Sequence, residues 1–309
     1  MRTLVTGGAG FLGRALTRVL VERGDEVLVL DRAAALGPDN GLPAAAQEVV
    51  CDIADAPATD ALVTNPVLIP PIDRAVHLAA MAAPGIAQKQ PGLTWSANAQ
   101  GTFNVLHLLR RLEVKRAVFT STAHVYGISP RYTPTDENHP FALQDTYTSS
   151  KIVGEELFSL FWKNHGLSYA TLRLFNGYGP GQSRDYFVPN KIAQAVEAWK
   201  NGSRGLKLMG RRVTKDWVHV NDIVRAIVLA LDSDYVGPLN VGTGVETSLE
   251  VIARQVADAF GLGLDFEGDD PGTRMQCDPR RAKTVLGWAP EVTLARGLAD
   301  LIERARAAR

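Results

Sequence analysis

Thr6-Gly7-Gly8-Ala9-Gly10-Phe11-Leu12-Gly13 is the stretch that decides the fold. It follows a short apolar run, Thr3-Leu4-Val5, and leads into apolar residues at helical spacing. Glycines allow a tight turn, and a helix N-terminus offers free N–H groups to a pyrophosphate. Strand, loop and helix come in the required order, so the stretch predicts a dinucleotide site rather than a merely structural turn. The expected contacts are Gly7, Gly10, Phe11 and Leu12.

The next two apolar runs predict the adenosine end of this site. Glu26–Leu30 is followed by Asp31, at the distance where an acidic residue binds the ribose diol and disfavours the extra phosphate of NADP. Arg32 beside it could accept that phosphate, so NAD is favoured and NADP stays open. A third run ends in Asp52-Ile53, a pair placed to meet the adenine; a turn or capping role for Asp52 is the alternative.

Tyr147-Thr148-Ser149-Ser150-Lys151 places a phenol and an ammonium four residues apart. On a helix these side chains share one face. A phenol titrates near pH ~10 in water, and a close ammonium stabilises the phenolate. We therefore predict a lowered pKa for Tyr147 and a role as an acid/base. Such spacing alone is common on ordinary helices, and it gains weight from the nucleotide site in the same chain.

Further motifs extend over nearly the whole chain. They are His77-Leu78-Ala79-Ala80, Asn98 before Gly101-Thr102, Thr120-Ser121-Thr122-Ala123-His124-Val125-Tyr126-Gly127, Arg173-Leu174-Phe175-Asn176-Gly177-Tyr178-Gly179-Pro180, Lys215-Asp216-Trp217-Val218-His219-Val220-Asn221-Asp222, Asn240-Val241-Gly242 and Leu286-Gly287-Trp288-Ala289-Pro290. With these motifs the chain resembles the extended short-chain dehydrogenases/reductases of the NAD-dependent epimerase/dehydratase family, which include the UDP-glucose/galactose 4-epimerases.

This resemblance assigns roles by position. It implies that Thr122 hydrogen-bonds the reacting sugar oxygen, that Tyr147 is the catalytic acid/base, and that Lys151 holds the nicotinamide ribose and lowers the pKa of the phenol. Ser121 is the alternative to Thr122. His124 and Tyr126 are interpreted as packing or rim residues. The implied cofactor is NAD, and its further expected contacts are Leu78, Ala79, Ala80 and Asn98.

The resemblance also predicts the substrate side, with departures from the family pattern. Asn176 and Val188 match residues around the nucleotide sugar. Lys215 stands where an Arg is common, and it keeps the charge without the bidentate fork. Asp269-Asp270 stand where an Arg usually precedes Pro-Gly, so Arg274 is expected to supply the missing guanidinium. Arg211 and Arg212 are further candidates, or surface charges.

The leading function is an NAD-dependent epimerase of a nucleotide sugar that acts through a transient ketone. Dehydration is disfavoured because Ala123-His124 replace the Asp-Glu pair that dehydratases place after the catalytic Thr. Two alternatives stay open. One is an NAD(P)-dependent ketoreductase or dehydrogenase of a sugar or other hydroxy compound, and the other is a non-catalytic NAD-binding interaction protein.

Composition agrees with an enzyme acting on a small molecule. Of 309 residues, 46% are hydrophobic, and 33 basic residues balance 33 acidic ones, which gives no case for nucleic acid or membrane partners. No apolar run of about 18 residues appears, and no leader precedes the first strand, so a cytoplasmic protein is expected. Two cysteines and six histidines show no metal-ligand spacing.

Strands and helices alternate through the first part, which predicts a Rossmann-type doubly wound parallel α/β sheet over residues 1–175. A smaller mixed α/β substrate lobe is expected over 176–309, with a return to the first lobe near 214–240. We expect a capping box of Thr247 and Glu250 before the helix Leu249–Phe260, with Gly261 ending it. A homodimer is expected through helices Thr94–Leu112 and Tyr147–His165, by way of Leu106, Leu109, Val153, Leu157, Phe158 and Phe161.

Overall fold

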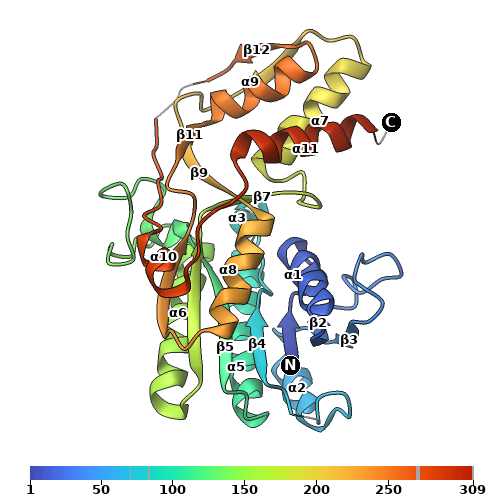
Figure 1. The fold of residues 1–309 in the computed structure, drawn as a ribbon, viewed down its shortest axis with the longest axis vertical. Coiled ribbons are helices and arrows are strands. Elements are labelled where there is room, and N and C mark those ends of the chain that lie inside the picture. The colour runs from blue at the N-terminus through green and yellow to red at the C-terminus, as the bar shows by residue number, and fades with distance from the viewer. Residues whose placement is uncertain (70, 83, 269–271, 308–309) are drawn as a thin grey trace.

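A computed structural model describes residues 1–69, 71–82, 84–268 and 272–307, and it is built around one large parallel sheet (Figure 1). Seven strands follow the order β10-β6-β5-β4-β1-β2-β3, and every neighbouring pair is parallel. Their bounds are β1 Arg2–Thr6, β2 Glu26–Asp31, β3 Gln47–Val50, β4 Arg74–His77, β5 Arg116–Thr122, β6 Ser168–Leu174 and β10 Gly237–Val241. The expected Rossmann-type fold is confirmed.

Helices cover both faces of this sheet, because successive strand side chains point to opposite sides. Leu4 packs in the core beneath α5 (Gly101–Arg111) and α6 (Thr146–His165), whereas its neighbour Val5 packs beneath α1 (Phe11–Glu22) and α8 (Val220–Asp232). Both residues are fully buried. This two-sided burial explains why the strands read as continuous apolar runs.

The helix expected over Thr94–Leu112 is divided into three parts. α4 (Pro91–Trp95) passes into a π-helical turn over Ser96–Gln100 before α5 begins. Such turns add a residue to the helical repeat and are frequent at functional sites. Before them lie α2 (Ala56–Ala61), a 3₁₀ turn over Leu62–Thr64 and α3 (Pro84–Lys89).

The smaller lobe is mixed, as expected. A three-stranded sheet has the order β11-β9-β7, and β8 pairs with β12. Its elements are β7 Asn176–Tyr178, α7 Phe187–Lys200, β8 Gly205–Leu208, β9 Thr214–His219, β11 Glu246–Ser248, α9 Leu249–Ala259, β12 Gly263–Phe266 and α11 Leu294–Ala307. Before α11, α10 (Arg280–Leu286) packs on the large lobe against α8. The helices α7, α9 and α11 lie at the top of Figure 1, and they share a hydrophobic core.

Two expectations for local structure need correction. The hydroxyl of Ser248, not of Thr247, caps α9 by accepting from the Val251 N–H, because β11 runs to Ser248 and the helix begins one residue later than the capping box required. β10 had not been expected as a strand. It lies beyond α8, which follows β9 directly and returns the chain to the large sheet.

No helix in the described part of the chain is long and apolar enough to cross a membrane. The same residues contain no group of three or more potential metal ligands.

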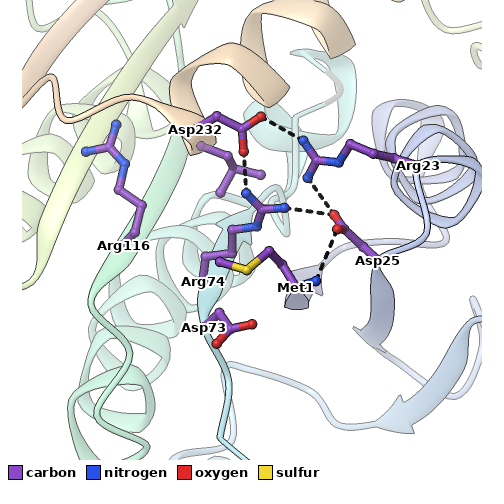
Figure 2. Close-up of a pocket in the computed structure, with 8 residues that line it drawn as sticks. Met1, Arg23, Asp25, Asp73, Arg74, Arg116 and Asp232 are labelled. Carbon is purple, nitrogen blue, oxygen red and sulfur yellow. Dashed lines mark hydrogen bonds and ion pairs between the residues drawn. The ribbon is translucent and has the colours of Figure 1, made fainter.

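A closed ring of four ion pairs joins elements at the amino ends of the strands (Figure 2). Arg23 contacts Asp25 at 2.5 Å and Asp232 at 2.8 Å. Arg74 contacts Asp25 at 2.9 Å and also pairs with Asp232. The ring therefore ties the end of α1, the start of β2, the start of β4 and the end of α8 together.

Arg74→Met should destabilise the fold by roughly 3 kcal/mol, the scale of breaking a buried ion pair. Arg74 and Asp25 are each only 6% exposed, so the carboxylate would lose a partner that water cannot fully replace. Chemical unfolding at pH 7 measures the change. Arg304→Met is the matched control because Arg304 is 64% exposed in its pair with Asp300, and such surface pairs contribute about 0–1 kcal/mol. Equal losses of unfolding free energy in the two variants would contradict the conclusion that the buried Arg74–Asp25 pair stabilises the fold.

The ring should also make stability depend on acid. Burial alone would raise the pKa of Asp25, but hydrogen bonds and charges from Arg23 and Arg74 outweigh it and lower that pKa. A lowered folded-state pKa contributes stability above the unfolded value near ~3.9, and this contribution is lost as pH falls through the folded-state value. In Arg74→Met this acid-dependent part of the unfolding free energy should shrink.

Candidate active site

A cleft of about 610 Å³ lies at the carboxyl ends of the central strands, where ligands bind in open α/β sheets. Both lobes line it. The residues from the large lobe include Leu12, Leu78, Ala80, Ser121, Thr122, His124, Tyr147 and Lys151, and those from the small lobe include Asn176, Gln182, Tyr186, Val188, Lys215 and Trp217.

The glycine loop at one end of the cleft fits a pyrophosphate. Gly7 has φ +72°, and a Cβ there would lie 2.6 Å from the Ala79 nitrogen. A Cβ on Gly13 would lie 2.3 Å from the Gly7 carbonyl oxygen, so only glycine allows this packing. Gly10 precedes α1 without a side-chain cap, which leaves the first N–H groups of the helix, including those of Phe11 and Leu12, for an anion.

Of the residues expected at the adenosine end, Asp31 contacts this loop. The Asp31 carboxylate accepts from the Ala9 N–H at 3.1 Å and from the Arg32 N–H at 2.8 Å, and Arg32 itself is exposed. Asp52 is exposed and accepts from the Ala54 N–H, so it also serves the turn after β3. Ile53 is buried, and its carbonyl oxygen accepts from Asn104.

Asn98 lies outside the lining of the cleft. Its buried amide bonds to the Met81 N–H at 2.8 Å, the Met81 carbonyl oxygen at 3.2 Å and the Ser150 hydroxyl at 3.1 Å. It thereby joins the loop after β4 to α6. The structure gives Asn98 a role in holding the walls of the site in place.

Thr122, Tyr147 and Lys151 meet at the middle of the cleft. Thr122 ends β5, and its hydroxyl accepts from the His124 N–H at 3.2 Å and lies near enough to the Tyr147 phenol to favour the phenolate. Asp145 caps α6 by accepting from the Thr148 N–H at 2.7 Å, which places Tyr147 in the first turn and Lys151 one turn later. The Lys151 ammonium donates to the Thr120 carbonyl oxygen at 2.9 Å and lies 4.8 Å from the centre of the Phe119 ring.

The expectation of a lowered pKa for Tyr147 is wrong in this structure. Burial and the charge of Tyr186 raise the pKa of the phenol above its usual value, and the hydrogen bond to Thr122 opposes them only in part. Burial lowers the pKa of Lys151 to about 8, against the opposing charge of Glu155. Desolvation therefore dominates at both groups, and the ammonium's hydrogen bond goes to a backbone carbonyl.

A buried polar network beneath these residues distinguishes Thr122 from Ser121. The Ser121 hydroxyl donates to Glu155 at 2.5 Å, and Glu155 is paired with Arg173 at 2.7 Å. Arg173 also donates to the Tyr126 hydroxyl at 2.9 Å. Ser121 is thus engaged in scaffold contacts, which leaves Thr122 as the hydroxyl beside Tyr147. Glu155 was not singled out from the sequence, although it lies one helical turn after Lys151.

His124 also has a place that the sequence interpretation missed. It lines the cleft rather than only its rim, and burial together with the Lys215 charge lowers its pKa to about 4. The imidazole is therefore neutral near pH 7. Its position two residues after Thr122 was the available signal.

Three of the four expected small-lobe contacts reach the cleft: Asn176, Val188 and Lys215. Burial lowers the pKa of Lys215, and none of the described residues forms an ion pair or hydrogen bond with its ammonium. Arg274 is not brought in. It is 63% exposed and forms a fork with Glu246, with contacts of 2.8 and 2.6 Å.

The remaining candidates for phosphate contact also lie elsewhere. Arg211 pairs with Glu250 at 3.0 Å, and neither Arg211 nor Arg212 lines the cleft. Asp269 and Asp270 lie outside the described residues.

A model of the NAD-dependent epimerase/dehydratase family matches residues 3–242. The chain belongs to this family. It is an NAD-dependent enzyme of the extended short-chain dehydrogenase/reductase type. Its similarity to characterised members extends over the whole length in both sequence and structure.

Among curated relatives, a UDP-glucose 4-epimerase of Mycolicibacterium smegmatis is 34% identical, over 98% of this chain and 98% of that protein. UDP-glucuronic acid decarboxylase 5 of Arabidopsis thaliana is 32% identical, over 96% of this chain and 87% of that protein. The structure of a Thermus thermophilus UDP-glucose 4-epimerase in complex with NAD superposes with a TM-score of 0.88 at 29% identity and covers 100% of both chains.

Proposed function

We propose that this family member is an NAD-dependent epimerase of a nucleotide sugar. The observation that carries the proposal is one cleft that joins Thr122, Tyr147 and Lys151 to the half-buried ammonium of Lys215, which has no partner among the described residues. The first group suits proton transfer from a hydroxyl, and the second suits an anionic part of the same substrate.

The side chains support a reversible oxidation at one carbon. As the phenolate, Tyr147 would take the hydroxyl proton while Thr122 hydrogen-bonds the oxygen, and NAD, when bound, would accept the hydride and return it. The ketone would then turn in the cleft and present its other face to the returning hydride, and Tyr147 would give the proton back. Because burial raises the pKa of Tyr147, its phenolate is a stronger base for the hydroxyl proton, and the phenol is a weaker acid in the return step.

His124 supports epimerisation over dehydration. A dehydratase needs an acid and a base beside the catalytic Thr to eliminate water. Here the neighbouring positions hold Ala123, which has no ionisable group, and a neutral imidazole.

Lys215→Ala should raise KM for the nucleotide sugar about tenfold or more, since a charged hydrogen bond to a phosphate contributes roughly 1.5–3 kcal/mol. NAD affinity should be unchanged, because Lys215 lies in the small lobe. Steady-state kinetics and NAD titration separate the two. Lys207→Ala is the control, as Lys207 is 71% exposed and pairs with Glu267. Calorimetry showing that no nucleoside diphosphate binds the wild-type enzyme would point to a substrate without a diphosphate.

The experiment that tests the proposed function is a substrate panel on purified enzyme with product analysis by NMR. UDP-glucose, UDP-galactose, their N-acetyl forms and UDP-glucuronic acid are incubated with enzyme and NAD. Interconversion of 4-epimers supports the proposal. Loss of CO₂ from UDP-glucuronic acid would instead make the chain a decarboxylase, as several of its relatives are named. A ketone formed together with free NADH would make it a dehydrogenase.

We also propose a homodimer, through a surface that differs from the expected one. Leu106, Leu109, Phe158 and Phe161 are buried within the subunit and contribute to its core. The exposed faces of α4, α5 and α6 carry other large apolar side chains, namely Leu93, Trp95, Phe103, Leu160 and Trp162. Light scattering should give twice the 33.4 kDa chain mass, and Phe103→Asp with Leu160→Asp should give monomers.

For the organisation of the chain, we propose a cofactor lobe over residues 1–175, completed by the return segment near 214–240, and a substrate lobe over 176–309. Within the return segment, α8 and β10 pack on the large sheet and support this division, whereas β9 pairs with β7 and β11 of the small lobe. A cytoplasmic location stays a prediction from composition.

A further inference from the structure

Arg14, in the first turns of α1, connects the two lobes with one guanidinium group. Its Nη1 donates to the Ala9 carbonyl oxygen at 2.6 Å, and its Nη2 donates to the Gly181 carbonyl oxygen at 3.1 Å. Ala9 belongs to the glycine loop of the large lobe. Gly181 belongs to segment 179–186, which follows β7 and leads to α7 in the small lobe.

Segment 179–186 forms a wall of the cleft. Gln182 and Tyr186 line the same cavity as Leu12 of α1. On its own lobe the segment is fixed by Gln182, whose side-chain amide donates to the Gly177 carbonyl oxygen at 2.8 Å. Across the cleft, the contact with Arg14 holds it. Since the start of α1 is the pyrophosphate end of a dinucleotide site, Arg14 fixes this wall beside the cofactor's diphosphate.

The charge of Arg14 is not neutralised by the protein. Its guanidinium has no carboxylate partner among the described residues and only carbonyl partners, whereas Arg23, Arg74 and Arg173 pair with carboxylates. Its stem is also confined, because a Cβ on Gly41 would lie 3.1 Å from the Arg14 Cδ. A held, half-buried cation at this place complements a diphosphate.

We infer that Arg14 is a cofactor-retaining residue, which fastens segment 179–186 over the pyrophosphate end of the cleft so that NAD is released only when the Arg14–Gly181 contact opens. The inference rests on NAD binding at α1 and goes beyond the proposed reaction. Retention suits that reaction, because the same cofactor molecule takes the hydride and returns it.

Dissociation of NADH tests this inference without any sugar substrate. The fluorescent complex is mixed with excess NAD in a stopped-flow instrument, and the rate of signal loss is followed. Arg14→Met should release NADH about tenfold faster or more, as expected for the loss of one charge-assisted contact. Arg14→Lys, which keeps the charge without the fork, should fall between Arg14→Met and wild type. Arg18→Met is the control, since Arg18 is exposed one turn further along α1.

Hydrogen exchange of residues 179–186 provides a second measurement. Amide exchange there should rise in Arg14→Met and stay unchanged in Arg18→Met. The inference would be overturned if Arg14→Met released NADH at the wild-type rate and amide exchange of residues 179–186 stayed unchanged. If Arg14→Met does not fold, Arg14→Gln carries the same two measurements. Neither measurement involves a sugar, so a failed epimerase assay leaves the result intact, and a failed retention test leaves the proposed function standing.

Discussion

Tyr147→Phe should lower turnover by at least about a hundredfold, the scale of removing a positioned acid/base. The substitution deletes only the hydroxyl that lies beside Thr122, so the fold and the glycine-loop site should be unaffected. Turnover at saturating substrate, NAD titration and thermal unfolding of the variant measure these three properties.

Tyr126→Phe is the control for a general effect of losing a buried phenol. Its hydroxyl donates to Asn240 at 2.6 Å and accepts from Arg173, away from the cleft lining. It should cost stability and leave much of the turnover intact. Near-normal activity of Tyr147→Phe would remove Tyr147 from the mechanism.

Lys151→Met is expected to lower turnover near pH 7 by about tenfold to a thousandfold and to move the pH–rate profile to higher pH. Both groups line the cleft, and a cation that comes within about 4–6 Å of the phenol in the working complex would change its pKa by about 1–3 units, each unit changing the phenolate fraction tenfold. The profile of the wild-type enzyme should also change as the ammonium loses its proton around the Lys151 pKa of about 8.

The pH profile separates electrostatic from structural roles of Lys151. A lost hydrogen bond to the Thr120 carbonyl oxygen would lower activity equally at every pH, whereas a lost cation moves the profile. NAD affinity should fall as well, because Lys151 is expected to hold the nicotinamide ribose. An unmoved profile would mean that burial and Thr122 alone set the pKa of the phenol.

Local motifs were enough to predict the large sheet except for β10, because each of its functional signals is contiguous. The glycine loop and the Tyr147/Lys151 pair need only one turn of backbone geometry to be interpreted. β10 was not expected because Gly237, Pro238 and Asn240 are poor strand formers, and its pairing with β6 joins segments far apart in the chain. Long-range pairing of this kind has no local signature.

The errors at the site have the same origin. Spacing placed Lys151 beside Tyr147 but could not show how far burial would raise the pKa of the phenol. Arg274 was expected at the phosphates as the substitute for a missing guanidinium. Its actual partner, Glu246, lies 28 residues away in the sequence, so no local pattern showed the pairing. Apolar residues on α5 and α6 looked suited to a dimer, yet only the packed structure separates those facing the core from Phe103 and Leu160, which face outward.

The central claim is that the hydride removed from the sugar returns to the same carbon. It is tested most directly with UDP-glucose that carries deuterium at C4 of the hexose, incubated with the enzyme in ordinary water. The account predicts UDP-galactose that retains the deuterium at C4, with no net NADH formed. Loss of the label to solvent, or a 4-keto product with one equivalent of NADH released, would contradict it.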